Sequence, residues 1–159
     1  MCPLYLIPKS DHLILEAYQD FILSRKASLL SPKTIEFYEY TVGEFIEWLS
    51  SQGLTEPENI TSFHVRAHIT GISERGVSTS TVHAHARGAR AFLRLLNEEG
   101  YISTPINVKM PRVEQKQMRA LSPEELKQIL KVCKKPRDKV LMLFLVDTGL
   151  RRSEAYSLK

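Results

Sequence analysis

The sequence predicts an all-α protein with a four-helix unit, a basic linker and the first helices of a second unit. Apolar residues recur at spacings of three and four along most of the chain, which is the periodicity of an amphipathic helix. Proline and glycine fall mostly at the ends of these periodic segments. No stretch alternates apolar and polar residues for long enough to predict a strand.

The first two helices have recognisable boundaries. The first is expected over residues 11–28, and the second begins at the N-cap Ser31, has Pro32 at its first position and ends near Gly53. The polar face of the second helix carries four glutamates, which repel phosphate. Only its first turn, with free backbone N–H groups and Lys33, suits an anion.

Two further helices complete the first unit. Thr61 can cap a third helix that runs to about residue 74, before the turn at Gly76. A fourth helix begins at Ser78 or Ser80 and ends at Gly100. Four helices joined by short loops are typical of a compact all-α domain, so we expect this domain over residues 1–104.

The helical periodicity disappears after this unit and then returns. Pro105 and Pro111 interrupt a stretch rich in Lys and Arg, which predicts a basic linker over residues 105–120 that lies outside any core. Ser122 and Glu125 form a capping box at the start of a new helix. A second helix, apolar on nearly every side, follows over residues 137–146. We expect residues 121–159 to be the start of an incomplete second domain.

Charge is distributed unevenly among these regions. Residues 1–104 carry 9 Lys and Arg against 12 Asp and Glu, the linker carries 4 against 1, and residues 121–159 carry 9 against 5. The first region therefore cannot bind a polyanion through its bulk charge. Any contact with nucleic acid requires its basic side chains to gather on one face.

The fourth helix provides such a face. At about 100° per residue, His83, Arg87, Arg90 and Arg94 fall within an arc of about 60°, beside an apolar arc. A packed helix with this pattern presents a row of cations to a phosphate backbone, although a solvated charged face is the common alternative. The other candidate DNA contacts are the hydroxyls of the helix start and lysines outside the helix: Ser80, Thr81, Lys33, Lys109 and Lys116.

The sequence argues against several other functions. The two cysteines, Cys2 and Cys133, are far apart and predict neither a disulfide nor a metal site in a reduced compartment. His64 and His68 share a helix face, but no further ligand completes a metal site, so we interpret the histidines as surface or half-buried residues. No apolar run approaches the roughly 18 residues that cross a bilayer. We expect a cytoplasmic protein with no cofactor, no metal, no membrane contact and no small-molecule substrate.

The last residues contain a short pattern that is specific to one family. From physical chemistry alone, residues 148–158 are a helix end, a turn at Gly149 and a new amphipathic helix, with Arg151 at the bend. The same residues match the pattern T-G-[LM]-R-x-S-E-x-x-x-L, and in this respect the chain resembles the tyrosine recombinases (phage integrases). Residues 31–53 and 80–105 resemble the two core-binding signatures of that family, and residues 121–125 resemble the entry to its catalytic domain.

The resemblance implies a fold and a reaction. In that family a SAM-like helical core-binding domain and a catalytic domain close around duplex DNA, and a tyrosine forms a 3′-phosphotyrosine intermediate without metal or nucleotide. By position, Arg151 corresponds to the first catalytic arginine, whereas Arg152 and Tyr156 receive no catalytic role. The later catalytic elements of the family, including the nucleophile, have no counterpart here, so these 159 residues alone are expected to be inactive.

The sequence therefore predicts the DNA-binding front part of a site-specific recombinase. Its partners would be duplex DNA and other recombinase protomers. Two alternatives remain open: a truncated protein that binds DNA without catalysis, and a helical module whose basic stripe binds an acidic protein.

Overall fold

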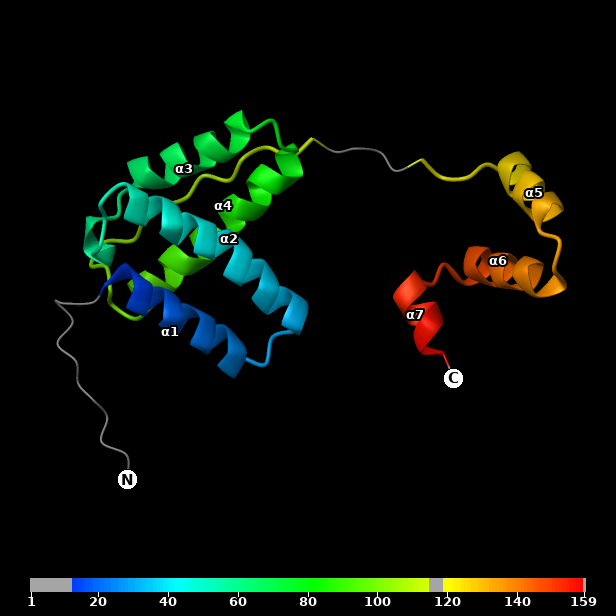
Figure 1. The fold of residues 1–159 in the computed structure, drawn as a ribbon, viewed down its shortest axis with the longest axis horizontal. Helices are drawn as coiled ribbons and strands as arrows, with labels where there is room; N and C mark the ends of the chain where they lie inside the picture. Colours follow the sequence, from blue (N-terminus) through cyan, green and yellow to red (C-terminus); the bar gives the residue numbers. More distant parts are fainter. Residues whose placement is uncertain (1–12, 115–118, 159) are drawn as a thin grey trace, which may run out of the picture. The chain divides into compact units, whose positions relative to one another are not determined.

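The computed structural model describes residues 13–114 and 119–158, and within them every regular element is helical. The all-α prediction is therefore confirmed for this part of the chain. Figure 1 shows the elements in order: α1 (Ile14–Ala27), α2 (Pro32–Ser51), the 3-10 turn η1 (Pro57–Asn59), α3 (Ser62–Glu74), α4 (Thr79–Glu98), α5 (Pro123–Val132), α6 (Pro136–Thr148) and α7 (Arg152–Ser157).

Capping residues define where the helices start. The Ser31 hydroxyl accepts a hydrogen bond from the backbone N–H of Thr34 at 3.2 Å, and Pro32 occupies the first position of α2. The Ser78 hydroxyl accepts from the backbone N–H of Thr81 at 3.2 Å, so Ser78 and not Ser80 is the N-cap of α4. At α5 the predicted capping box is present, with the Ser122 N–H donating to Glu125 at 2.9 Å.

The chain divides into two compact units, Met1–Gln115 and Lys116–Lys159. In the first unit α1 and α2 lie side by side and α4 packs across both, while α3 packs mainly on α4. The core is formed by their apolar faces and includes Phe21 of α1, which is fully buried. The Phe21 ring makes edge contacts with Tyr38, at 5.2 Å between centroids, and with Phe92, at 5.6 Å.

The segment after α4 contributes to this core, which differs from the expected linker. Ile102 and Val108 are buried and Ile106 packs against the core. The sequence predicted that the linker begins at residue 105 and lies outside any core. For residues 105–108 this prediction is wrong, because the segment packs on the core. Since Pro105 interrupts this segment and its apolar side chains belong to no longer helical repeat, the sequence pattern did not indicate their burial.

A very close helix contact in the first unit joins α4 and α2. Gly88 of α4 lies against Thr41 of α2, and a Cβ atom built on Gly88 would stand 2.2 Å from the Thr41 hydroxyl oxygen and 2.8 Å from its Cβ. Thr41 is itself only 2% exposed, and its hydroxyl donates to the Phe37 carbonyl at 2.8 Å. Glycine at position 88 therefore allows a helix separation that any side chain would prevent.

Two histidines lie in the core, which corrects the interpretation of the histidines as surface or half-buried. His68 is 1% and His85 is 2% exposed, and the Nδ1 of His85 lies 3.5 Å from Glu44, which also pairs with Arg75. Neither ring nitrogen of His68 has a hydrogen-bond partner among the described residues. Burial lowers the pKa of His68 to about 4 and also lowers that of His85.

The second unit has well-formed helix ends, but no side chain of its helices reaches full burial. None of the residues of α5, α6 and α7 is buried, and Val140, Leu141, Leu143, Phe144 and Val146 of α6 are all exposed. The predicted inner face of α5 is half-buried at best. In the described ranges, no helix combines the length and apolar character that a bilayer crossing requires.

The α2–α4 contact makes a prediction about glycine replacement. Gly88→Ala should lower the free energy of unfolding by about 1–3 kcal/mol, because the new methyl group overlaps Thr41 and the helices must separate. Gly71→Ala is the matched control, since Gly71 lies within α3 and its added Cβ would meet no atom within 4 Å. That variant should be neutral or gain up to about 1 kcal/mol from helix propensity. Equal effects in urea denaturation would contradict the close contact.

The buried histidines make the stability depend on pH. Because the pKa of His68 is lowered in the folded state, the unfolded chain binds more protons below about pH 6.5. The stability from the neutral ring is complete above that pH and should be lost as the pH falls toward 4, with a slope of at most about 1.4 kcal/mol per pH unit per proton.

The variant His68→Phe tests which residue is responsible, because it places another aromatic ring, one that does not titrate, in contact with Phe45 and Trp48. Urea denaturation at several pH values should show a smaller loss of stability toward pH 4 than in the parent chain. Identical pH profiles would show that His68 does not carry the effect.

Candidate nucleic-acid interface

The basic residues of α4 lie on the face opposite the core. Arg87, Arg90 and Arg94 are exposed and His83 is half-buried. The apolar side of the same helix is buried, with Val82, Ala86, Ala89, Leu93 and Leu96 all at or below 7% exposure. The predicted division of α4 into a core face and a basic face is thus confirmed. Since the core face anchors the helix, the arginines have fixed backbone positions.

An aromatic ring of α2 orients one of these arginines. The guanidinium carbon of Arg87 lies 4.5 Å from the ring centroid of Phe37. This cation–π contact holds the guanidinium at the junction of the two helices while leaving the side chain exposed. An arginine held in this way loses less conformational entropy when it binds an anion.

Three helices together form a hollow beside this stripe. Its volume is about 410 Å³, and we call it the basic groove; its lining residues are Arg25 of α1, Tyr38 of α2, and Arg87, Arg90, Ala91, Arg94 and Glu98 of α4. Four guanidinium groups therefore face one carboxylate. Arg25 was not among the residues predicted from the sequence to contact DNA. Its position four residues after Phe21, and hence on the core-facing side of α1, was the available signal.

The carboxylate in the groove is paired with one of the arginines. The Arg94 Nε donates to Glu98 at 2.7 Å, and this hydrogen bond raises the pKa of Arg94 above its ordinary value. The pair is solvent-exposed, so its net strength is small. A phosphate oxygen that binds Arg94 has to compete with this partner.

The remaining predicted DNA contacts do not line the groove. Lys33 is exposed in the first turn of α2, and Lys109 is exposed after α4. Ser80 is exposed, whereas the Thr81 hydroxyl is hydrogen-bonded to Ser78 at 2.9 Å. Lys116 lies outside the described residues.

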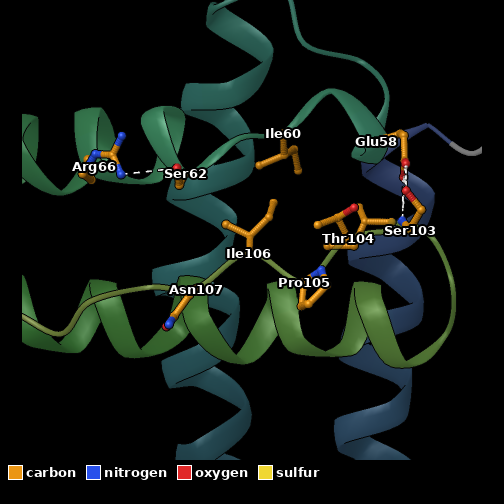
Figure 2. A pocket seen from close by; sticks show the side chains of 10 residues that line it. Glu58, Ile60, Ser62, Arg66, Ser103, Thr104, Pro105, Ile106 and Asn107 are labelled. Carbon is orange, nitrogen blue, oxygen red and sulfur yellow. Dashed lines mark hydrogen bonds between the residues drawn. The ribbon is translucent and has the colours of Figure 1, made fainter.

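A second hollow in the first unit has a different character. It measures about 460 Å³ and lies between the start of α3 and residues 102–107 (Figure 2). Glu58 accepts from the Ser103 backbone N–H at 3.0 Å, and Arg66 donates to the Ser62 hydroxyl at 3.2 Å. Arg66 and Glu58 are the charged residues of its lining, and both are engaged in these local hydrogen bonds. The bond between Glu58 and Ser103 holds the segment after α4 in place. The lining residues therefore offer no cluster of positive charge.

Arg151 stands at the predicted bend of the second unit. Gly149 ends α6 in the left-handed conformation, at φ 64°, and Arg151 is the N-cap of α7. The Arg151 N–H donates to Glu154 at 2.8 Å, and its guanidinium pairs with the same carboxylate at 3.2 Å. The side chain is exposed. Within the described ranges, no group of three or more His, Cys, Asp or Glu side chains is arranged to hold a metal ion.

Comparison with known protein families gives a match that covers most of the first unit. Residues 17–102 match the family described as phage integrase, N-terminal SAM-like domain. This range includes most of α1 and all of α2, α3 and α4, and therefore the whole basic groove.

Relatives of this chain include recombinases and a transposase. The tyrosine recombinase XerC of Oceanobacillus iheyensis is 31% identical, with 81% of this chain and 45% of that protein covered. Transposase A from transposon Tn554 of Staphylococcus aureus is 26% identical, with 99% of this chain and 54% of that protein covered. The chain thus spans about half the length of these relatives.

A solved structure has the same fold as the first unit. It is the N-terminal domain of a phage integrase/site-specific recombinase from Haloarcula marismortui, with a TM-score of 0.57 and 18% identity. The match covers 61% of this chain and 94% of that domain. The four-helix arrangement is therefore one that a separate domain adopts.

Proposed function

Because the chain belongs to the phage integrase N-terminal SAM-like domain family, we propose that its first helical unit binds duplex DNA through the basic face of α4. The observation that carries this proposal is the grouping of Arg87, Arg90 and Arg94 on one exposed face of an otherwise acidic unit. Segregated arginines of this kind bind phosphates through counterion release and paired hydrogen bonds.

The dimensions of the stripe suit a DNA backbone. Arg87 and Arg94 are seven residues apart, which corresponds to about 10 Å along a helix axis. One strand of B-DNA carries a phosphate about every 3.4 Å along its axis, so the stripe spans the axial distance of about three phosphates. Further DNA contacts are proposed for Lys33, Ser80, Thr81, His83, Lys109 and Lys116, of which Lys116 lies outside the described residues.

We further propose that the parent activity is site-specific DNA strand exchange through a 3′-phosphotyrosine intermediate. The match to the tyrosine recombinase XerC and the T-G-L-R-x-S-E sequence at residues 148–154 support this proposal. In this interpretation the core-binding domain extends from residue 1 through the packed residues 105–108, the linker follows up to residue 120, and residues 121–159 are the start of the catalytic domain. Arg151 would then bind a non-bridging oxygen of the scissile phosphate as negative charge develops there.

DNA binding by the stripe is tested with a double variant. Arg87→Ala with Arg90→Ala should weaken duplex binding and make the plot of log affinity against log salt shallower by roughly 0.9 for each phosphate that is no longer neutralised. Fluorescence anisotropy over a range of salt concentrations measures both quantities.

The control is the double variant Lys26→Ala with Arg66→Ala, which removes the same charge. Lys26 pairs with Glu39, Arg66 bonds within α3, and neither lines the basic groove. This variant should bind nearly as the parent chain does. If both double variants lose the same affinity, net charge and not the α4 face is responsible.

The interpretation of residues 148–158 also has a test. This chain should form no covalent adduct with a nicked duplex, because the resemblance assigns none of its residues as the nucleophile and Tyr156 is a 92% exposed residue of α7. In a chain that carries the nucleophile, Arg151→Ala should reduce cleavage by several orders of magnitude and leave binding nearly unchanged. An adduct through Tyr156, or cleavage that survives the Arg151 change, would contradict the assignment.

A further inference from the structure

Arg25 has an unusual environment for an arginine of a first helix. It lies in the last turn of α1, with its guanidinium carbon 5.0 Å from the ring centroid of Phe21. Its Nε atom is buried and has no hydrogen-bond partner among the described residues. Because the Nε is enclosed and the guanidinium lies over the Phe21 ring, its terminal N–H groups are the donors that Arg25 offers to the basic groove that it lines.

An acceptor would enter a site that already concentrates positive charge. Arg25 shares the basic groove with Arg87, Arg90 and Arg94, which come from a helix more than fifty residues later in the sequence. Phe21 and Phe37 each hold one of these guanidinium groups over an aromatic ring. Two arginines held in this way on different helices form a built site and not a random surface charge.

We infer that the basic groove binds a phosphate of the DNA backbone, that Arg25 is one of its ligands, and that Glu98 is the competing anion that this phosphate displaces from Arg94. The inference rests on the proposed function, which it deepens by adding α1 to the DNA-contacting surface. Glu98 then acts as a built-in competitor that weakens binding of anions with poor geometry. A phosphate that reaches several guanidinium groups replaces it, because each paired hydrogen bond to a phosphate is charge-assisted.

Removal of the competitor provides a test that does not threaten the fold. Glu98→Gln should tighten duplex binding by about two- to fivefold at low salt, the range expected for one exposed ion pair. Glu99→Gln is the matched control, because Glu99 is the neighbouring exposed acid, loses the same charge and does not line the groove. Glu99→Gln should therefore increase affinity less than Glu98→Gln does.

Replacement of Arg25, the side chain proposed to bind the phosphate, provides the complementary test. Arg25→Ala should weaken duplex binding and make the salt dependence shallower by about 0.9, whereas Lys26→Ala, with the same charge change on the next residue, should not. Arg25→Lys keeps the charge and loses the planar fork, so it should retain the salt dependence and lose part of the affinity. Thermal unfolding of each variant shows whether removal of the guanidinium from the Phe21 ring affects the fold.

The outcomes separate this inference from the proposed function. If Arg25→Ala and Arg25→Lys bind as the parent chain does, or if Glu98→Gln and Glu99→Gln are equal, the groove is not a phosphate site. The proposed function survives that result as long as the Arg87 and Arg90 double variant still loses affinity. If the parent chain shows no salt-dependent binding to a duplex, the proposed function itself is wrong.

Discussion

The close contact between Gly88 and Thr41 is the constraint on which the first unit depends. The absence of a side chain at position 88 of α4 leaves room for the Thr41 side chain of α2, whose hydroxyl oxygen and Cβ would overlap a Cβ atom placed there. Arg87 precedes Gly88, and Phe37 lies one turn before Thr41, so the same contact places the guanidinium over the ring. Core packing and the orientation of the basic face therefore have one common origin.

The arrangement of charge follows from this packing. The first unit is acidic overall, yet two of its α2 carboxylates are used within the unit: Glu39 pairs with Lys26, and Glu44 pairs with Arg75 and approaches His85. These pairs neutralise the acidic face locally, and the lining of the basic groove contains one carboxylate, Glu98, against its four arginines. A net negative domain can in this way present a positive surface to a polyanion.

The two units differ in what stabilises them. In the first unit, side chains from four helices and from the segment after α4 form one buried core. In the second unit, α5 and α6 have strong local signals, namely a capping box and a left-handed glycine, but none of their side chains is buried. Local sequence signals are thus sufficient to define helix ends, whereas a core needs contacts between distant segments.

The sequence alone determined the helix boundaries, the apolar faces and the basic stripe of α4, because each depends on residues within a few turns of one another. It also predicted the bend at Arg151, which follows from Gly149. Only the tertiary structure decided the burial of His68 and Val108 and the entry of Arg25 into the groove. Burial and groove formation depend on segments that are far apart in the chain, and a periodicity within one helix carries no information about which other helix its face will meet.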